Sequence, residues 1–292
     1  MHHSAPKNSL IALLIETCQS KTPFTFNIYL KKALEFEINL NENIDNSKCN
    51  IFYLACQNGQ HEMVASLLLH NVDINILSGQ QVTAFDIACI QGHEKVVRLF
   101  LNKDVNINRY VRGCMPIIFK VIYEDKLAVF EELLSFPGIN LNKFDIKNAD
   151  TPLTYAIFQR KTKMAKLLIA HGADVNLKNE KGANAFHRAC YYGETEIMEE
   201  LLKINPEFIN MPDDKGTTPA WICSEIDNTK VTEILIKNGA DFKRIIHNNM
   251  SPATNAIKKG NNTTLMMALN QAPEQPANTE ESMPEATASF KI

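Results

Sequence analysis

The asparagines of this chain return at an almost constant interval. Asn75, Asn108, Asn142, Asn176 and Asn210 follow one another at steps of 33, 34, 34 and 34 residues, and several end a segment such as VDIN or ADVN. A fixed period of about 20 to 50 residues is typical of an array of stacked structural units. We therefore expect the 292 residues to form an elongated array built from one repeated unit.

A second marker keeps the same period. Small residues recur from Ala156 to Ala189 after 33 residues, from Ala189 to Cys223 after 34, and from Cys223 to Ala256 after 33. Small side chains allow neighbouring helices to approach closely, so we place these residues inside one helix of each unit. Because two independent markers share one period, the repeat extends through most of the chain.

Each unit carries the signals of a helix start. In the pair Thr151-Pro152, the Thr hydroxyl can cap a helix and Pro suits the first helical position. Pro116, Pro219 and Pro252 are predicted to occupy the same position in their units. An apolar stripe follows in each unit, which indicates a second helix with one buried face.

Glycines such as Gly92 and Gly193 are predicted to end the first helix, because glycine readily adopts the left-handed conformation found there. One unit departs from this pattern. It has Lys120 where a small residue is expected and Glu124 where the glycine is expected. A weak unit can divide such an array into separate cooperative blocks, so we expect a local stability minimum around residues 111–130.

These residues carry a resemblance to a known family. The stretches GTTP at 216–219, GHEKVV at 92–97 and HGADVN at 171–176 are similar to the ankyrin repeat, and the chain is identified as a member of that family. The resemblance implies an all-α solenoid of helix-turn-helix pairs with projecting β-turn fingers. We expect an N-terminal cap or degenerate repeat at 1–44, repeats at 45–77, 78–110, 111–144, 145–177, 178–211, 212–244 and 245–269, and a disordered acidic tail at 270–292.

Composition excludes several classes of function. Thirty Lys and Arg residues against 33 Asp and Glu residues give a net charge of −3, which argues against a nucleic-acid partner. Apolar runs are too short to span a membrane, and the first 20 residues lack the features of a Sec signal peptide. Seven cysteines without paired short spacings favour a reducing cytosol. We expect a cytosolic monomer with no membrane span.

The sequence gives little sign of catalysis. Phosphate-binding, dinucleotide-binding and zinc-protease motifs are absent, so we predict no enzyme, no cofactor and no metal site. A nucleophile built from Cys190 and His187 is a remote alternative, because Cys190 falls in the small-residue position of its unit. Cys49 and Cys114 lie in projecting turns and are predicted to be accessible thiols.

The resemblance places a protein partner on a concave face lined by the fingers and the first helices. Rigid aromatic residues and Arg are enriched at binding hot spots. Tyr191 and Tyr192 are the strongest candidates, because adjacent helix positions diverge and both rings cannot enter one core. Trp221 has the alternative of filling the gap between helices. The complete predicted set is Tyr110, Arg112, Tyr123, Phe158, Tyr191, Tyr192 and Trp221.

The tail suggests a setting for this function. Its proline-rich, acidic composition predicts disorder. Glu280, Glu281 and Phe290 resemble the C-terminal export signals of ankyrin effectors that intracellular bacteria deliver into the host cytosol by type IV secretion. The partner would then be a host protein. The alternatives are an inert tail and an endogenous cytosolic scaffold.

The resemblance also raises a possible modification. Host asparaginyl hydroxylases recognise this family at the position that Asn75, Asn108 and Asn176 occupy here. Bonding within the turns explains the same asparagines equally well.

Overall fold

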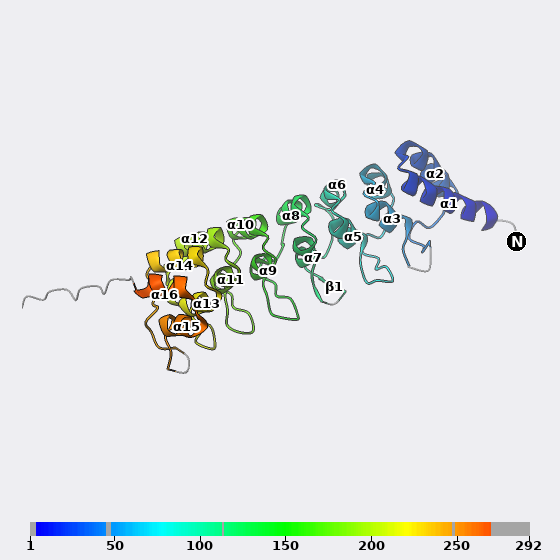
Figure 1. The fold of residues 1–292 in the computed structure, drawn as a ribbon. Coiled ribbons are helices and arrows are strands. Elements are labelled where there is room, and N and C mark those ends of the chain that lie inside the picture. The colour runs from blue at the N-terminus through cyan, green and yellow to red at the C-terminus, as the bar shows by residue number, and fades with distance from the viewer. Residues whose placement is uncertain (1–3, 45–47, 113, 247–248, 270–292) are drawn as a thin grey trace, which may run out of the picture.

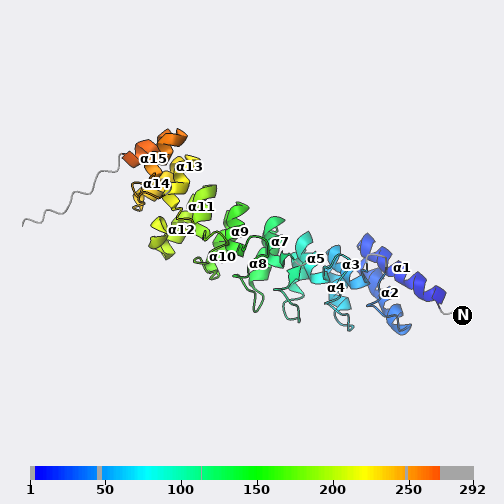
Figure 2. The same cartoon turned by 90° about the horizontal axis from the view of Figure 1, so that it is seen from below.

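The computed structural model describes residues 4–44, 48–112, 114–246 and 249–269. Helix pairs stack side by side into an elongated body, and the loops between pairs project from one side as fingers (Figure 1). Seen from below, the first and second helices of the pairs form two separate rows (Figure 2). The all-α solenoid expected from the sequence is confirmed.

The two rows follow the chain in strict alternation. The first row, which lies beside the fingers, contains α3 (Ile51–Gln57), α5 (Ala84–Gln91), α7 (Ile117–Tyr123), α9 (Pro152–Phe158), α11 (Ala185–Tyr192), α13 (Pro219–Ile226) and α15 (Pro252–Lys259). The second row contains α4 (His61–Leu67), α6 (Glu94–Arg98), α8 (Leu127–Leu134), α10 (Thr162–Ala170), α12 (Thr195–Ile204), α14 (Thr229–Lys237) and α16 (Asn262–Leu269).

Five further elements of the described chain lie outside these rows. The helices α1 (Ser4–Ser20) and α2 (Pro23–Glu35) pack together at the N-terminal end. A short 3₁₀ helix η1 (Pro206–Asn210) follows α12, and the strands β1 (Tyr110–Val111) and β2 (Met115–Pro116) form an antiparallel pair in one finger.

Polar side chains cap the first helices as predicted. The Thr151 hydroxyl accepts from the Thr154 amide at 3.2 Å, and Thr218 accepts in the same way from Trp221 at 3.3 Å. Pro152, Pro219 and Pro252 occupy the first helical positions. Pro116 is different. It precedes α7, pairs in the small sheet and provides no side-chain cap, so its predicted position was wrong by one residue.

The unit of α7 is more regular than its sequence suggested. In the repeat of α5, the His93 amide bonds to the Ala88 carbonyl at 3.0 Å; the matching bond around α7 joins Lys126 to Val121 at 3.1 Å. Val121 is therefore the small-residue position, and it is fully buried. Asp125, with φ 56°, is the left-handed residue. Assigning these roles to Lys120 and Glu124 was wrong by one residue, which removes the reason for expecting a stability minimum over 111–130.

Apolar side chains between the two rows form the core. Phe100 packs edge-on against Phe52 and Phe85, with ring centroids 5.9 and 5.3 Å apart. Phe85 also contacts Phe136, at 5.4 Å, in the following repeat. Because the rings touch from one repeat to the next, the core is continuous along the array.

The periodic asparagines link neighbouring repeats. The Asn108 side chain donates to the Gly138 carbonyl at 2.8 Å and accepts from the Asn140 amide at 2.8 Å. Asn210 makes the matching bonds to Gly239 and Asp241, at 3.2 and 2.8 Å. These asparagines therefore hold the loop of the next repeat as well as their own turn.

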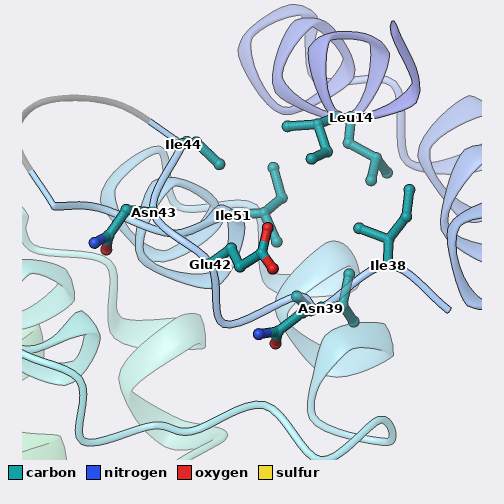
Figure 3. Close-up of a pocket in the computed structure, with 9 residues that line it drawn as sticks. Leu14, Ile38, Asn39, Glu42, Asn43, Ile44 and Ile51 are labelled. Atoms are coloured by element: carbon teal, nitrogen blue, oxygen red, sulfur yellow. The ribbon is translucent and has the colours of Figure 1, made fainter. Parts of the chain in front are cut away.

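At the N-terminal end, a narrow apolar hollow lies between α1 and the first residues of α3 (Figure 3). Leu14, Ile38 and Ile51 line it, and Glu42 lies at its side. Its volume of about 20 Å³ has room for about one water molecule, so it does not offer a ligand site.

Candidate partner-binding surface

The first helices and the fingers share one side of the array, which we call the inner face, and most of the predicted binding residues lie on the elements of this side (Figure 1). Tyr123 ends α7, Phe158 ends α9, and Tyr191 and Tyr192 end α11. The exposed fractions of Tyr123, Phe158 and Tyr191 are 57%, 42% and 56%. Such exposure of large rings is unusual for residues that fill a core, so these side chains are available to a partner.

The rings are in mutual contact over three repeats. Phe119 contacts Tyr155 at 5.2 Å between centroids, and Tyr155 contacts Phe158 at 6.1 Å. Phe158 then contacts Tyr192 at 5.6 Å, across the boundary between α9 and α11. Tyr192 contacts Tyr191 at 5.0 Å. We call Tyr155, Phe158, Tyr191 and Tyr192 the aromatic ladder. Two of its contacts are edge-to-face and one is tilted, and these contacts restrict the orientations of the rings.

Tyr110 and Arg112 lie in the finger that contains β1. The Tyr110 hydroxyl donates to the Phe144 carbonyl at 3.0 Å, and Lys143 lies 4.4 Å from its ring centroid. Arg112 is exposed and donates to the Gln80 side chain at 2.6 Å. Both residues are thus held towards neighbouring fingers, at the edge of the inner face.

Trp221 does not belong to this surface. Only 7% of the residue is exposed, in the first turn of α13. This burial favours the alternative reading of Trp221, in which the indole fills a gap between helices. Its inclusion among the contact residues needs correction, because a buried ring offers a partner little area.

The guanidinium of Arg188 lies near one ring of the aromatic ladder. Its guanidinium carbon lies 5.7 Å from the Phe158 centroid, and one nitrogen donates to both carboxylate oxygens of Asp150 at 2.8 and 3.0 Å. Burial raises the pKa of Asp150, while the positive charge of Arg188 opposes that rise. Asp150 lies just before α9 and Arg188 lies on α11, so this ion pair joins two repeats.

Arg188 and Tyr155 are not among the residues predicted from the sequence. Tyr155 is half-buried, and its ring lies between Phe119 and Phe158. Both residues lie five positions before the left-handed residue of their units, Arg160 and Gly193. An alignment of the repeats that compares every position of the first helix would identify this inner-face position from the sequence.

A hollow of about 410 Å³ adjoins the aromatic ladder. Tyr191 and Tyr192 form one wall, Ile222 of α13 contributes an apolar patch, and Lys181 and Glu225 bring opposite charges. A partner side chain entering this space would meet aromatic, apolar and charged groups together. That combination is typical of a protein-binding surface and differs from a closed pocket for a small molecule.

The Cys190 and His187 pair gives no support to a nucleophilic site. Cys190 is fully buried, and burial raises the pKa of its thiol well above the usual range. His187 Nδ1 lies 2.7 Å from Asn184 Oδ1 in the cap of α11, and burial lowers the pKa of the imidazole. A reactive thiol needs the opposite pKa shift.

The two cysteines predicted to be accessible differ in their exposure. Cys114 is exposed and Cys49 is half-buried. Within the described ranges, we find no group of three His, Cys, Asp or Glu side chains placed to hold a metal ion. No described helix has the length and apolar character needed to cross a membrane. Glu280, Glu281 and Phe290 lie outside the described residues.

Comparison with known proteins identifies the repeat. The family model described as ankyrin repeats (3 copies) matches residues 2–110 and 117–213. The ankyrin repeat domain of Bcl-3 superposes with a TM-score of 0.59 over 87% of this chain and 96% of that domain, at 17% sequence identity. The ankyrin repeat domain of human ASB11 gives a TM-score of 0.59 over 74% of this chain and 96% of that domain, at 18% identity. At such identities the superpositions establish the fold alone.

Curated relatives share the repeats within longer proteins. A putative ankyrin repeat protein of Rickettsia bellii is 33% identical over 129 residues, which are 44% of this chain and 18% of the relative. The NAD-dependent deacetylase sir2B of Dictyostelium discoideum is 26% identical over 242 residues, which are 78% of this chain and 30% of the relative. The chain thus spans less than a third of either relative.

Proposed function

This chain belongs to the ankyrin repeat family, and from that premise we propose that it binds one protein partner on the inner face of its array. As an ankyrin repeat array it is a protein interaction module, a fold that typically serves as a non-enzymatic scaffold. The proposal goes further by assigning the contact to the aromatic ladder, together with Tyr110, Arg112 and Tyr123.

The observation that carries this proposal is the exposure of preorganised rings. Tyr191 and Phe158 each leave about half of their surface open, yet both are fixed by contact with Tyr192. A ring that is already ordered loses little conformational entropy on binding, so more of its contact energy appears as affinity. Aromatic side chains of this kind are frequent among the residues that dominate binding energy.

The proposal is tested by affinity capture from cell lysate with the full chain and with the double variant Tyr191→Ala/Tyr192→Ala. We expect the captured protein to be lost from the variant, while the thermal unfolding midpoint stays within a few degrees. Phe24→Ala is the matched control, because it removes an exposed ring from α2, far from the inner face. Retained capture by the tyrosine variant, or equal loss with Phe24→Ala, would contradict the assignment.

We further propose that the chain acts as a bacterial effector on a host protein in the host cytosol. Two observations support this setting: the export-like residues Glu280, Glu281 and Phe290, and the similarity to a Rickettsia protein. Residues 270–292 fused to a translocation reporter should be delivered by a type IV secretion system. Absence of delivery, or delivery that is unchanged when Phe290 is deleted, favours an endogenous cytosolic scaffold instead.

A further inference from the structure

Three consecutive repeats present one exposed ring at the same structural position. Tyr123, Phe158 and Tyr191 each lie two residues before the left-handed residue of their unit. The flanking repeats have Ile90 and Glu225 at this position. The helices α7, α9 and α11 that carry the rings pack against one another in order. The exposed rings therefore form a regular row of three, and the two flanking repeats do not extend the row.

The spacing of this row restricts the conformation of a bound segment. Packed helices lie about 8–10 Å apart, so successive rings recur at about that interval. A polyproline II segment rises about 3.1 Å per residue with three residues per turn, which brings every third side chain to the same face after about 9 Å. An α-helix needs about six residues for the same advance. The row therefore matches an extended segment with one apolar anchor at every third residue.

The charge around the row restricts the composition of that segment. Residues 109–124, 143–159 and 177–192, which are the fingers and first helices of these three repeats, contain eight Lys and Arg against four Asp and Glu. Arg188 is paired with the buried Asp150, and Arg109 is paired with Asp86 of the preceding repeat, so six cations and three carboxylates of these stretches remain outside those two ion pairs. The equivalent stretch of the preceding repeat, 76–91, has one Asp, and that of the following repeat, 210–226, has three acidic residues and one Lys. Positive charge is thus concentrated around the rings of a chain whose net charge is −3.

Two of these cations already lie near the rings. Lys120 is 5.8 Å from the Tyr123 centroid, and Arg188 is 5.7 Å from that of Phe158. Lys147 and Lys181 extend from neighbouring fingers and are exposed. A modest excess of positive charge between apolar rings matches a peptide segment in which carboxylates alternate with apolar side chains. A nucleic-acid backbone would require a denser row of cations.

We propose that this face binds an acidic, extended segment of a partner protein, with an apolar residue at every third position seated on Tyr123, Phe158 and Tyr191. The inference rests on the proposed function, because it specifies the partner of the same surface. Asp and Glu residues between the anchors face Arg112, Lys147 and Lys181. Opposite charges across the interface set the orientation of the segment and increase the rate of encounter.

The test selects random peptides of about twelve residues, displayed on phage, against the full chain. Enriched peptides should be rich in Asp and Glu and should carry apolar residues three apart. Synthetic copies should bind Lys147→Glu/Lys181→Glu about tenfold more weakly. The control Lys230→Glu/Lys237→Glu makes the same charge change on exposed residues of α14 and should bind as the native chain does.

The outcomes separate this inference from the proposed function. Neutral or basic peptides that still require Tyr191 and Tyr192 overturn the acidic segment and leave the binding surface intact. Peptides indifferent to the tyrosine double variant overturn both. Apolar spacing of six or seven residues overturns the extended conformation. Failure to enrich any peptide, or tighter binding of a polyuridylate oligonucleotide than of the best peptide, also overturns the inference.

Discussion

Arg188 of α11 donates to both carboxylate oxygens of Asp150, a residue 38 positions earlier in the chain, at 2.8 and 3.0 Å. The same guanidinium lies over the ring of Phe158. Only a small part of Asp150 reaches solvent, and Asp145 lies close to it. Arg188 therefore contacts both the buried carboxylate of Asp150 and the ring of Phe158 on the inner face.

This pair makes stability depend on pH. Burial, the main cause, raises the pKa of Asp150 above its ordinary value of 3.8. The folded state therefore holds this proton more tightly than the unfolded chain, and the stability contribution of Asp150 falls as pH rises from about 4 through the folded pKa. The free energy of unfolding of the native chain, relative to Asp150→Asn, should decrease over this range in urea titrations. A difference that is flat or rises with pH would contradict the shift.

Removing Arg188 alone should lower the stability of the protein. Arg188→Met leaves the buried carboxylate of Asp150 without its cation, and we expect a loss of about 3 kcal/mol in the free energy of unfolding at neutral pH. The double variant Arg188→Met/Asp150→Asn removes the uncompensated charge and should recover part of that loss. Additive effects of the two substitutions in a double-mutant cycle would show that the pair is not coupled.

The asparagine links predict unequal effects at equivalent positions. Asn108→Ala removes two bonds to the loop of the next repeat and should destabilise the protein by about 1–2 kcal/mol. The Asn176 side chain donates to Asp174 in its own turn at 3.2 Å and accepts only a long bond from Asn205, at 3.4 Å, so Asn176→Ala should cost about 0.5 kcal/mol or less. Urea denaturation compares the two. Equal losses would mean that the links between repeats add nothing.

The end of α11 provides a test of close packing. Gly193 has φ 73°, and a Cβ atom there would lie 2.8 Å from the side chain of Asn228 in the next repeat. Gly172 has φ 81° with nothing within 4 Å. Gly172→Ala should therefore cost about 1 kcal/mol from the backbone alone, and Gly193→Ala about 1 kcal/mol more. Matching thermal shifts for the two variants would argue against the steric contribution.

Thiol accessibility can be measured directly. Cys114 is exposed, whereas Cys18, Cys56, Cys89, Cys190 and Cys223 are buried and Cys49 is half-buried. Burial raises the pKa of Cys18 to about 12, which suppresses its reactive thiolate. Iodoacetamide should label one thiol rapidly in the native protein, and Cys114→Ser should abolish this phase. Persistence of rapid labelling in that variant would place the accessible thiol elsewhere.

Periodicity predicted the fold because each repeat obeys the same local rules. The caps at Thr151 and Thr218 and the left-handed residue at Gly193 follow from backbone chemistry that sequence displays directly. The slip at Lys120 arose because Asp125, with φ 56°, replaces glycine without an obvious signal. Asp occupies this conformation more readily than most residues. Aligning the repeats by their period therefore locates the left-handed residue better than searching for glycine does.

The binding surface was less predictable than the fold. Residue type identified Tyr191 and Phe158, but it also selected Trp221, whose burial depends on how α13 packs against its neighbours. Arg188 was missed because its role needs Asp150, which lies in another repeat. Contacts between repeats depend on the geometry of stacking, and the sequence of a single unit does not contain it.

The charge of the molecule is unevenly divided. With eight of its 30 cationic residues in the three finger and first-helix stretches that surround the rings, the remainder of the chain has 22 Lys and Arg against 29 Asp and Glu. Positive charge therefore predominates around the rings, and negative charge predominates in the rest of the sequence. An anionic partner would be rotated towards the rings before contact, so added salt should slow association far more than it speeds dissociation.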